Sequence, residues 1–248
     1  QRSRHGARFA LGLGLLSSGS TVHAATTYDV LVAPRDTAAA ANAEAQVNGS
    51  SVFAERKIHA AFSRTQELLA RCGDCTVRIK IASGIYTGKA GTGQWTFPEV
   101  QAPEATLRIL GGYAEDFSRR DPFGDPTLLQ VSEDRSDAVL RFEGRRHALR
   151  ELVVSGLTID TGPSNSYGTK NNSLHKGGSS SFPILAFGYL TTDRLVISDN
   201  VFANAPNGVG GPLIRAMSPE AEVRVENNVF LNNVFPWVVG SGGGKHIP

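Results

Sequence analysis

Apolar residues recur at two different periods along this chain. Between residues 53 and 71 they return every three or four positions, which is the spacing of one face of an α-helix. The positions of this face are Ile58, Ala61, Phe62, Thr65, Leu68 and Leu69. Gly73 follows, where a helix commonly ends. The pattern predicts one helix over 53–71 and no second helix of comparable strength.

After residue 75 the apolar positions alternate with polar ones. They form runs of four or five residues that are rich in β-branched side chains and bounded by Gly, Pro, Asn and Asp. Such runs are typical of short strands. We predict strands over four of them: 77–81, 107–110, 127–131 and 138–142.

Three later segments repeat one another. Residues 152–159 align with 195–202 at an offset of 43, and 195–202 align with 223–230 at an offset of 28. The offset of 28 also superimposes 185–186 on 213–214. A fixed period in the twenties is typical of a solenoid, in which each unit buries its apolar side against its neighbours.

In a right-handed parallel β-helix the repeated strand and bend would direct four side chains of each coil inward. In one coil these are Leu195, Ile197, Asn200 and Phe202. Asn200 would stack on Asn228 of the next coil, and their amides would satisfy backbone groups that burial otherwise leaves unpaired. We therefore predict an Asn ladder formed by these two residues.

The coils resemble the repeat of the pectate-lyase-like superfamily of secreted bacterial parallel β-helix proteins. The likeness rests on Asp-Asn-Val-Phe at 199–202, Asn-Asn-Val-Phe at 227–230, Gly-Ile-Tyr at 84–86 and Leu-Gly-Gly-Tyr at 110–113. It covers residues 27–248. It implies an all-β, right-handed parallel β-helix solenoid with an N-terminal strand and a capping helix. Because this scaffold carries lyases, hydrolases, epimerases and adhesins, the resemblance indicates a fold rather than one activity.

The first 24 residues have the pattern of a secretory signal peptide. Three arginines precede a short apolar run at 9–16, and small residues follow at 22–25. Cleavage after Ala24 would remove these three arginines from the 25 Lys and Arg, leaving 22 against 23 acidic residues. We therefore expect export to the extracellular space or the cell surface, with the periplasm as the alternative.

The expected organisation has three parts. A signal peptide (1–24) is followed by an N-terminal strand and capping helix (25–75) and then by the parallel β-helix (76–248). A solenoid requires a cap at its end, and the final residues begin another coil without one. We therefore expect the β-helix to be truncated at its C-terminus.

Export bears on Cys72 and Cys75, the only cysteines. In an oxidising compartment, such a pair forms a structural disulfide, here at the turn between the helix and the first strand. A redox-active pair is the alternative. One pair is too few for a four-ligand zinc site. We expect a disulfide that fixes the geometry of the turn.

Stacked coils can hold a metal only where acidic residues of successive coils fall in one column. The offsets of 43 and 28 place no two acids in the same column, so the residues indicate no metal site and no cofactor. Calcium is implied by the family resemblance alone. Asp199 and Glu226 lie on adjacent coils and are the weak candidates for paired catalytic acids, which lie about 5–9.5 Å apart in glycosidases. Solvated strand-edge acids are the simpler interpretation.

The insertion at 162–182 holds most candidate ligand-binding residues. Long loops in compact repeats are often functional, although a flexible Ser- and Gly-rich excursion is the alternative. The candidates offer an aromatic face, charge and hydrogen bonds to a sugar: Tyr167, Lys170, Asn171, Asn172, His175 and Lys176. Lys170 and Lys176 are also the weak candidates for the base of a lyase. Arg194, Arg215 and Arg224 could line the same surface, or pair with Glu222 or Glu226.

These patterns predict a secreted or cell-surface β-helix protein that contacts extracellular polysaccharide as a non-catalytic binding or structural module. The alternative is a polysaccharide lyase or glycoside hydrolase acting in a groove beside the 162–182 loop. A net charge of +2 gives no electrostatic footprint for nucleic acid. No apolar run approaches the ~20 residues that span a bilayer. The sequence does not indicate the glycan or the oligomeric state.

Overall fold

The structure is a computed structural model, and it describes ten stretches of the chain. These are residues 26–87, 95–130, 139–142, 147–160, 185–187, 190–203, 214–216, 222–231, 233 and 239–241. The predicted signal peptide at 1–24 and the insertion at 162–182 both lie outside the described residues.

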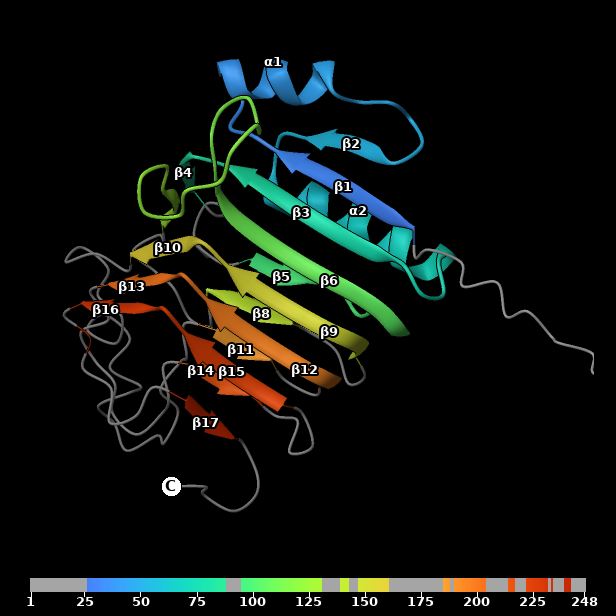
Figure 1. The fold of residues 1–248 in the computed structure, drawn as a ribbon, viewed down its shortest axis with the longest axis vertical. Coiled ribbons are helices and arrows are strands. Elements are labelled where there is room, and N and C mark those ends of the chain that lie inside the picture. The colour runs from blue at the N-terminus through green and yellow to red at the C-terminus, as the bar shows by residue number, and fades with distance from the viewer. Residues whose placement is uncertain are drawn as a thin grey trace, which may run out of the picture.

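Strands dominate the fold and form three parallel sheets, to which two helices are added (Figure 1). The largest sheet has seven strands, in the order β15 (Glu222–Glu226), β12 (Leu190–Ser198), β9 (His147–Ser155), β6 (Gln101–Tyr113), β3 (Thr76–Ala82), β1 (Thr27–Val32) and β2 (Val52–Glu55). A five-stranded sheet has the order β16 (Val229–Leu231), β13 (Val201–Ala203), β10 (Leu157–Asp160), β7 (Thr127–Gln130) and β4 (Gly84–Thr87). The other five-stranded sheet has the order β17 (Val239–Ser241), β14 (Ile214–Ala216), β11 (Leu185–Phe187), β8 (Leu140–Phe142) and β5 (Trp95–Phe97).

From β3 onward the chain visits the three sheets in a fixed rotation. Each unit of three strands, beginning with β3, β4 and β5, contributes one strand to every sheet and pairs with the units before and after it. The four strands predicted early in the sequence overlap β3, β6, β7 and β8. The prediction of an all-β chain with parallel sheets is thus confirmed, whereas its solenoid form stays a prediction.

The repeat offsets agree with strand register at most positions. Leu195 lies opposite Leu152 and Val223, as the offsets of 43 and 28 require. The offset fails in the third sheet, where Leu185 pairs with Ile214 rather than with residue 213. Leu195 follows Leu185 by ten positions in the sequence, but Val223 follows Ile214 by only nine. The connection to the next unit has therefore shortened by one residue, which shifts the alignment.

Inward side chains stack in continuous columns across the strands. In the seven-stranded sheet one column passes through buried β-branched residues, namely Ile79, Ile109, Val154 and Ile197. In the third sheet the rings of Phe97, Phe142 and Phe187 follow one another at centroid distances of 5.0 and 5.3 Å. Each buried Phe contributes roughly 1.5–3 kcal/mol by leaving water, and aromatic pairing adds about 0.5–1.5 kcal/mol. These columns form the core.

Helix α2 (Ile58–Arg71) covers the first unit of this core. Its predicted apolar face is buried, and Phe62 extends the aromatic column with its ring centroid 5.0 Å from that of Phe97. The helix starts at Ile58, so the predicted start at residue 53 is wrong. Val52 and Phe53 instead pair with β1 as strand β2, because aromatic and β-branched side chains suit an open sheet edge better than a helix.

A second helix, α1 (Ala38–Ala45), was missed by the sequence prediction. Six of its eight residues are alanine, so helical propensity is high while the apolar periodicity is almost absent. Thr37 caps it by accepting a hydrogen bond from the Ala40 backbone N–H at 3.2 Å. Ala39, Ala40 and Ala43 are buried against a small cluster that includes Leu31. Figure 1 shows α1 beside β2, at the end of the fold opposite β17.

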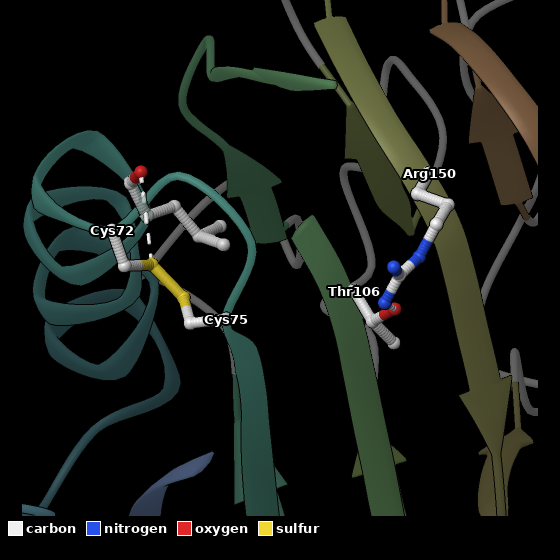
Figure 2. Close-up of a disulfide and its surroundings, with 5 residues drawn as sticks. Cys72, Cys75, Thr106 and Arg150 are labelled. Atoms are coloured by element: carbon white, nitrogen blue, oxygen red, sulfur yellow. Dashed lines mark hydrogen bonds between the residues drawn. A yellow bond between two sulfur atoms is a disulfide. The ribbon is translucent and has the colours of Figure 1, made fainter. Parts of the chain in front are cut away.

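A disulfide joins Cys72, at the end of α2, to Cys75, immediately before β3 (Figure 2). The expected structural disulfide is therefore present. Cys75 is fully buried and packs in the main core with Leu69 and Val77. The bond thus holds the turn between α2 and the first strand of the repeating units.

At the bend from the seven-stranded sheet to the next, the four units after the first each carry one residue with positive φ. These residues are Gly112, Gly156, Asp199 and Asn227, with φ of 80°, 76°, 56° and 55°. Glycine adopts this left-handed conformation freely, and Asp and Asn adopt it at moderate cost. The bend of one unit packs closely on the next, so a Cβ added at Gly156 would lie 2.6 Å from the carbonyl oxygen of Gly111.

Replacing Gly156 with Ala should therefore be strongly destabilising. The side chain would meet both the left-handed backbone and the Gly111 carbonyl, and we expect a loss of more than about 2 kcal/mol in the free energy of unfolding. Urea denaturation followed by circular dichroism would measure it. Gly73→Ala is the matched control, since nothing lies within 4 Å of its added Cβ. Equal midpoints for the two variants would contradict this account of the bend.

Removing the disulfide should lower the free energy of unfolding less than Gly156→Ala does. Its loop closes over only four residues, for which loop-closure entropy gives about 2 kcal/mol. We expect the double variant Cys72→Ala/Cys75→Ala to remain folded with a lower Tm, and reductant to lower the Tm of the unmodified protein similarly. The double variant should itself be insensitive to reductant. A failure of either form to fold would mean that the disulfide does more than hold one turn.

Candidate functional site

Charged side chains occupy the outer side of the seven-stranded sheet. They alternate with inward apolar residues, as Arg78 and Lys80 do on either side of buried Ile79. We call this set the charged face: Asp29, Arg78, Lys80, Arg108, Glu151, Arg194, Glu222 and Arg224. The period of two in each strand and the parallel register together bring these residues into rows across six strands, from β1 to β15.

At the β1 end of the charged face one carboxylate joins two cations. Arg78 donates to Asp29 through Nε at 2.6 Å and through its second guanidinium nitrogen at 2.8 Å. Lys80 Nζ lies 2.8 Å from the same carboxylate and 5.7 Å from the ring centroid of Tyr113. The hydrogen bond to Asp29 raises the pKa of Arg78. Its guanidinium is therefore charged at neutral pH.

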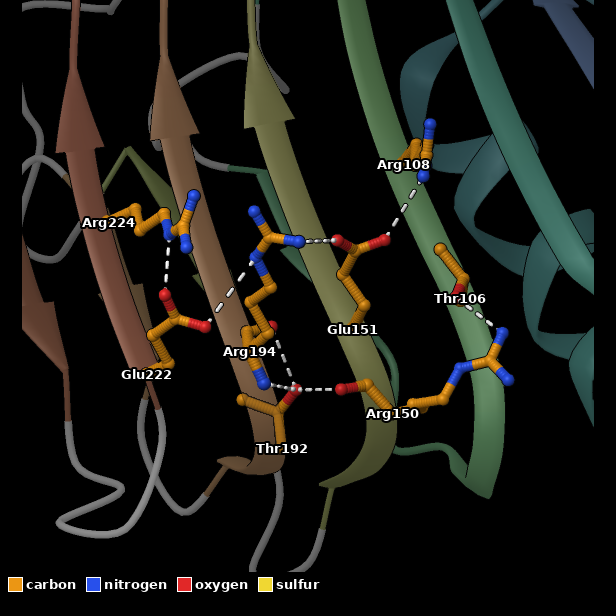
Figure 3. A network of polar contacts seen from close by, with 8 residues as sticks. All are labelled: Thr106, Arg108, Arg150, Glu151, Thr192, Arg194, Glu222 and Arg224. Atoms are coloured by element: carbon orange, nitrogen blue, oxygen red, sulfur yellow. Dashed lines mark hydrogen bonds and ion pairs between the residues drawn. The ribbon is translucent and has the colours of Figure 1, made fainter.

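The same arrangement continues toward β15, where cations and carboxylates alternate (Figure 3). Glu151 lies 3.2 Å from an Arg108 nitrogen and 3.5 Å from an Arg194 nitrogen. Glu222 contacts Arg194 at 3.9 Å and also pairs with Arg224. The alternative given for Arg194 and Arg224, that they pair with Glu222, is confirmed.

Like charges on this face are kept from facing one another. Arg78 and Arg108 are register partners on adjacent strands, an arrangement that is unfavourable on its own. Arg78 turns toward Asp29 on one side, and Arg108 turns toward Glu151 on the other. Each Arg thus points to a different carboxylate, and the row accommodates more cations than acids.

The charged face has an excess of cations. Its ion pairs join five cations to three carboxylates. Arg108 and Arg224 side chains are 46% and 48% exposed, and exposed pairs of this kind contribute only about 0–1 kcal/mol each. A guanidinium has five N–H donors, and Arg108 uses one on Glu151. The face can therefore offer further hydrogen bonds to hydroxyl and carboxylate groups of a ligand.

The structure gives Asp199 a local contact network. Its carboxylate accepts hydrogen bonds from the hydroxyls of Ser155 at 3.1 Å and Ser198 at 3.0 Å. Arg120 donates to the Ser155 hydroxyl at 2.6 Å, which extends the network to the preceding unit. Glu226, the register partner of Ser198, is exposed at the end of β15. Asp199 is therefore tied to the bend that it helps to form.

Asn200 and Asn228 lie one above the other at the bends of adjacent units. The side-chain amide of Asn200 donates to the Asn228 side-chain oxygen at 3.0 Å and to the Val154 carbonyl at 3.1 Å. Its own oxygen accepts from the Leu157 backbone N–H at 2.9 Å. Asn228 in turn donates to the Ile197 carbonyl at 2.8 Å. Asn200 is fully buried, and these bonds satisfy its amide.

The insertion candidates lie outside the described residues, so the structure does not place them: Tyr167, Lys170, Asn171, Asn172, His175 and Lys176. Most of the charged face was missed by sequence reasoning, which had noted only Arg194, Arg224 and Glu222. Alternating charges in the strands around Arg78 and Arg108 were the signal that could have revealed it. In the described part of the chain, no group of three or more His, Cys, Asp or Glu gathers as a metal site.

No family model, curated protein or solved structure matches this chain. Among the described residues, no helix has the length and apolar character needed to cross a membrane. The geometry of the charged face is therefore the main indication of function.

Replacing Asn228 with Leu should leave the protein folded but less stable. The change removes the acceptor for Asn200 and the donor to the Ile197 carbonyl, and buried groups left unpaired cost about 1–3 kcal/mol. Thermal unfolding would measure the loss. Asn227→Gly is the matched control, because Asn227 is exposed and its φ of 55° suits Gly. An unchanged Tm for Asn228→Leu would contradict a stabilising role for this pair.

Proposed function

We propose that this chain forms a right-handed parallel β-helix in a secreted protein and binds extracellular polysaccharide without catalysis. The rotation of successive strands through three parallel sheets supports a helical solenoid. The burial of α2 over the first unit supports its role as a cap. Under this proposal the seven-stranded sheet is one long side of the solenoid and the charged face is its outer surface.

The proposal depends mainly on one observation, the ordered excess of cations on the charged face. Five cations share three carboxylates, and strands in a sheet repeat about every 4.8 Å. A polysaccharide likewise presents hydroxyl or carboxylate groups at regular intervals. Guanidinium groups match carboxylates well because their planar donors can bind both oxygens. We therefore propose an acidic polysaccharide as the preferred ligand class.

Catalysis is left out of the proposal for the described residues because of Asp199. Both hydroxyl contacts of its carboxylate come from neighbouring serines of the bend, so the group already has a structural task. A lyase or hydrolase beside the 162–182 loop remains the alternative function. It would use either residues of that loop, which lie outside the described residues, or the sequence candidates Asp199 and Glu226, and an assay for cleaved product would detect it.

Binding should be measured on immobilised acidic and neutral polysaccharides, with calcium and with chelator. We expect retention on an acidic glycan that weakens as salt rises, because ions screen exposed charges over about 10 Å at 0.1 M. The triple variant Arg108→Gln/Arg194→Gln/Arg224→Gln should bind at least about tenfold more weakly, or about 1.4 kcal/mol. Arg71→Gln, an exposed change in α2, is the control and should bind normally.

The same incubations should be assayed for unsaturated sugars and new reducing ends. Unsaturated product would replace the proposal with a lyase and direct attention to Lys170 and Lys176. New reducing ends alone would indicate hydrolysis and direct attention to Asp199 and Glu226. Retention on none of the glycans would refute polysaccharide binding by this chain.

A further inference from the structure

A second feature lies away from the charged face, at the end of the fold that begins the chain. It is a cavity of about 480 Å³ between the segment after β1, the connection from β2 to α2, and strand β4. Ligand cavities commonly have volumes of about 300–1,000 Å³. The cavity is therefore large enough for a small organic molecule.

Basic residues from separate segments converge on this cavity. Arg35 follows β1, Arg56 and Lys57 connect β2 to α2, and His59 lies in the first turn of α2. None of the described residues that line it is a carboxylate. Arg35 and Lys57 form no ion pair with the described part of the chain, whereas Arg56 pairs with Glu44 at 2.6 Å. The cavity thus carries a net positive charge.

The Glu44 contact belongs to a neighbouring space. A smaller cavity of about 340 Å³ shares Arg35, Arg56 and Lys57 with the first, and its lining includes Glu44 and Glu55. The hydrogen bond to Glu44 raises the pKa of Arg56, so this guanidinium keeps its charge. Glu44 and Glu55 line only the smaller cavity, so the charged lining of the larger cavity is basic.

The lining of the larger cavity also includes apolar residues. Ile85 on β4 lines it and is 61% exposed, which is unusual for a large aliphatic side chain. Tyr86 beside it is buried, and its hydroxyl donates to backbone carbonyls. A ligand in this cavity would therefore meet both cations and an apolar surface. Inorganic ions satisfy only the first of these conditions.

The N-terminus of α2 also favours an anion in this cavity. Lys57 occupies the N-cap position without a side-chain hydrogen bond, and the first turn contains no acidic residue. Backbone N–H groups at a helix start carry partial positive charge and favour anions. This effect strengthens the field of the basic side chains but would not define a site without the cavity.

We propose that the cavity binds a small organic oxyanion, a carboxylate or phosphate carried on a body of about one sugar ring with an apolar side. Arg35 and Lys57 would contact the anionic group, and Ile85 would pack against the body. The proposal does not depend on polysaccharide binding, because none of these residues belongs to the charged face.

The test titrates the protein with four probes: D-glucose 6-phosphate, D-glucuronate, D-glucose and inorganic phosphate, followed by NMR or calorimetry. We expect at least one of the two sugar anions to bind at least tenfold more tightly than glucose and inorganic phosphate. The phosphate and carboxylate probes distinguish the two forms of oxyanion. Binding of inorganic phosphate as tight as that of both sugar anions would overturn the proposal, as would no binding of either sugar anion.

Variants would assign binding to the cavity. Arg35→Gln and Lys57→Gln should each weaken binding of the sugar anion at least fivefold. Ile85→Ala should also weaken this binding, without raising the affinity for inorganic phosphate. Both basic residues are exposed, so the variants should fold, and thermal unfolding would check this. Arg71→Gln, at the other end of α2, is the matched control. Sugar-anion binding that survives both basic substitutions would overturn the assignment to this cavity. The triple variant of the charged face should leave sugar-anion binding unchanged.

Discussion

Register between parallel strands is the constraint on which the rest of this structure depends. Equivalent strands of successive units pair residue by residue, as Leu195 does with Leu152 and Val223. Each side chain therefore lies beside its equivalent from the unit before and after. Inside the fold this order produces unbroken apolar and aromatic columns. Outside, it aligns charges on one face. One backbone arrangement thus determines both the core and the candidate binding surface.

The bends are where this regularity is hardest to maintain. A chain that leaves one sheet for the next needs left-handed backbone, and Gly112 and Gly156 adopt it most easily. In later units Asp199 and Asn227 take the same position, where backbone conformation is less favourable but side chains can add contacts. Asn200 then supplies the hydrogen bonds that a buried turn requires. Stability at the bends therefore comes from close packing early in the chain and from polar side chains later.

The sequence predicted the elements whose periodicity is clear. Helix α2 and strands such as β3 follow from apolar spacing, and the repeats predicted the pairing around Leu195. Helix α1 could not be found in this way, since a run of alanines has no polar face to reveal a period. The charged face required the pairing of β6 with β3 and with β9, where no repeat was visible and where β6 has irregular register. The basic cavity joins segments outside the repeats, so only three-dimensional structure could assemble it.

The alternation of charge along the face also affects how the chain finds its fold. Glu222 of β15 lies opposite Arg194 of β12. If β15 slid by two residues in the direction that moves Arg224 to the place of Glu222, its apolar side chains would still face the core, but Arg224 would then oppose Arg194. Like charges directly opposite one another are unfavourable, while a slide of one residue would turn the apolar side chains outward. Repulsion between the arginines thus disfavours this shifted register, which hydrophobic burial alone would accept.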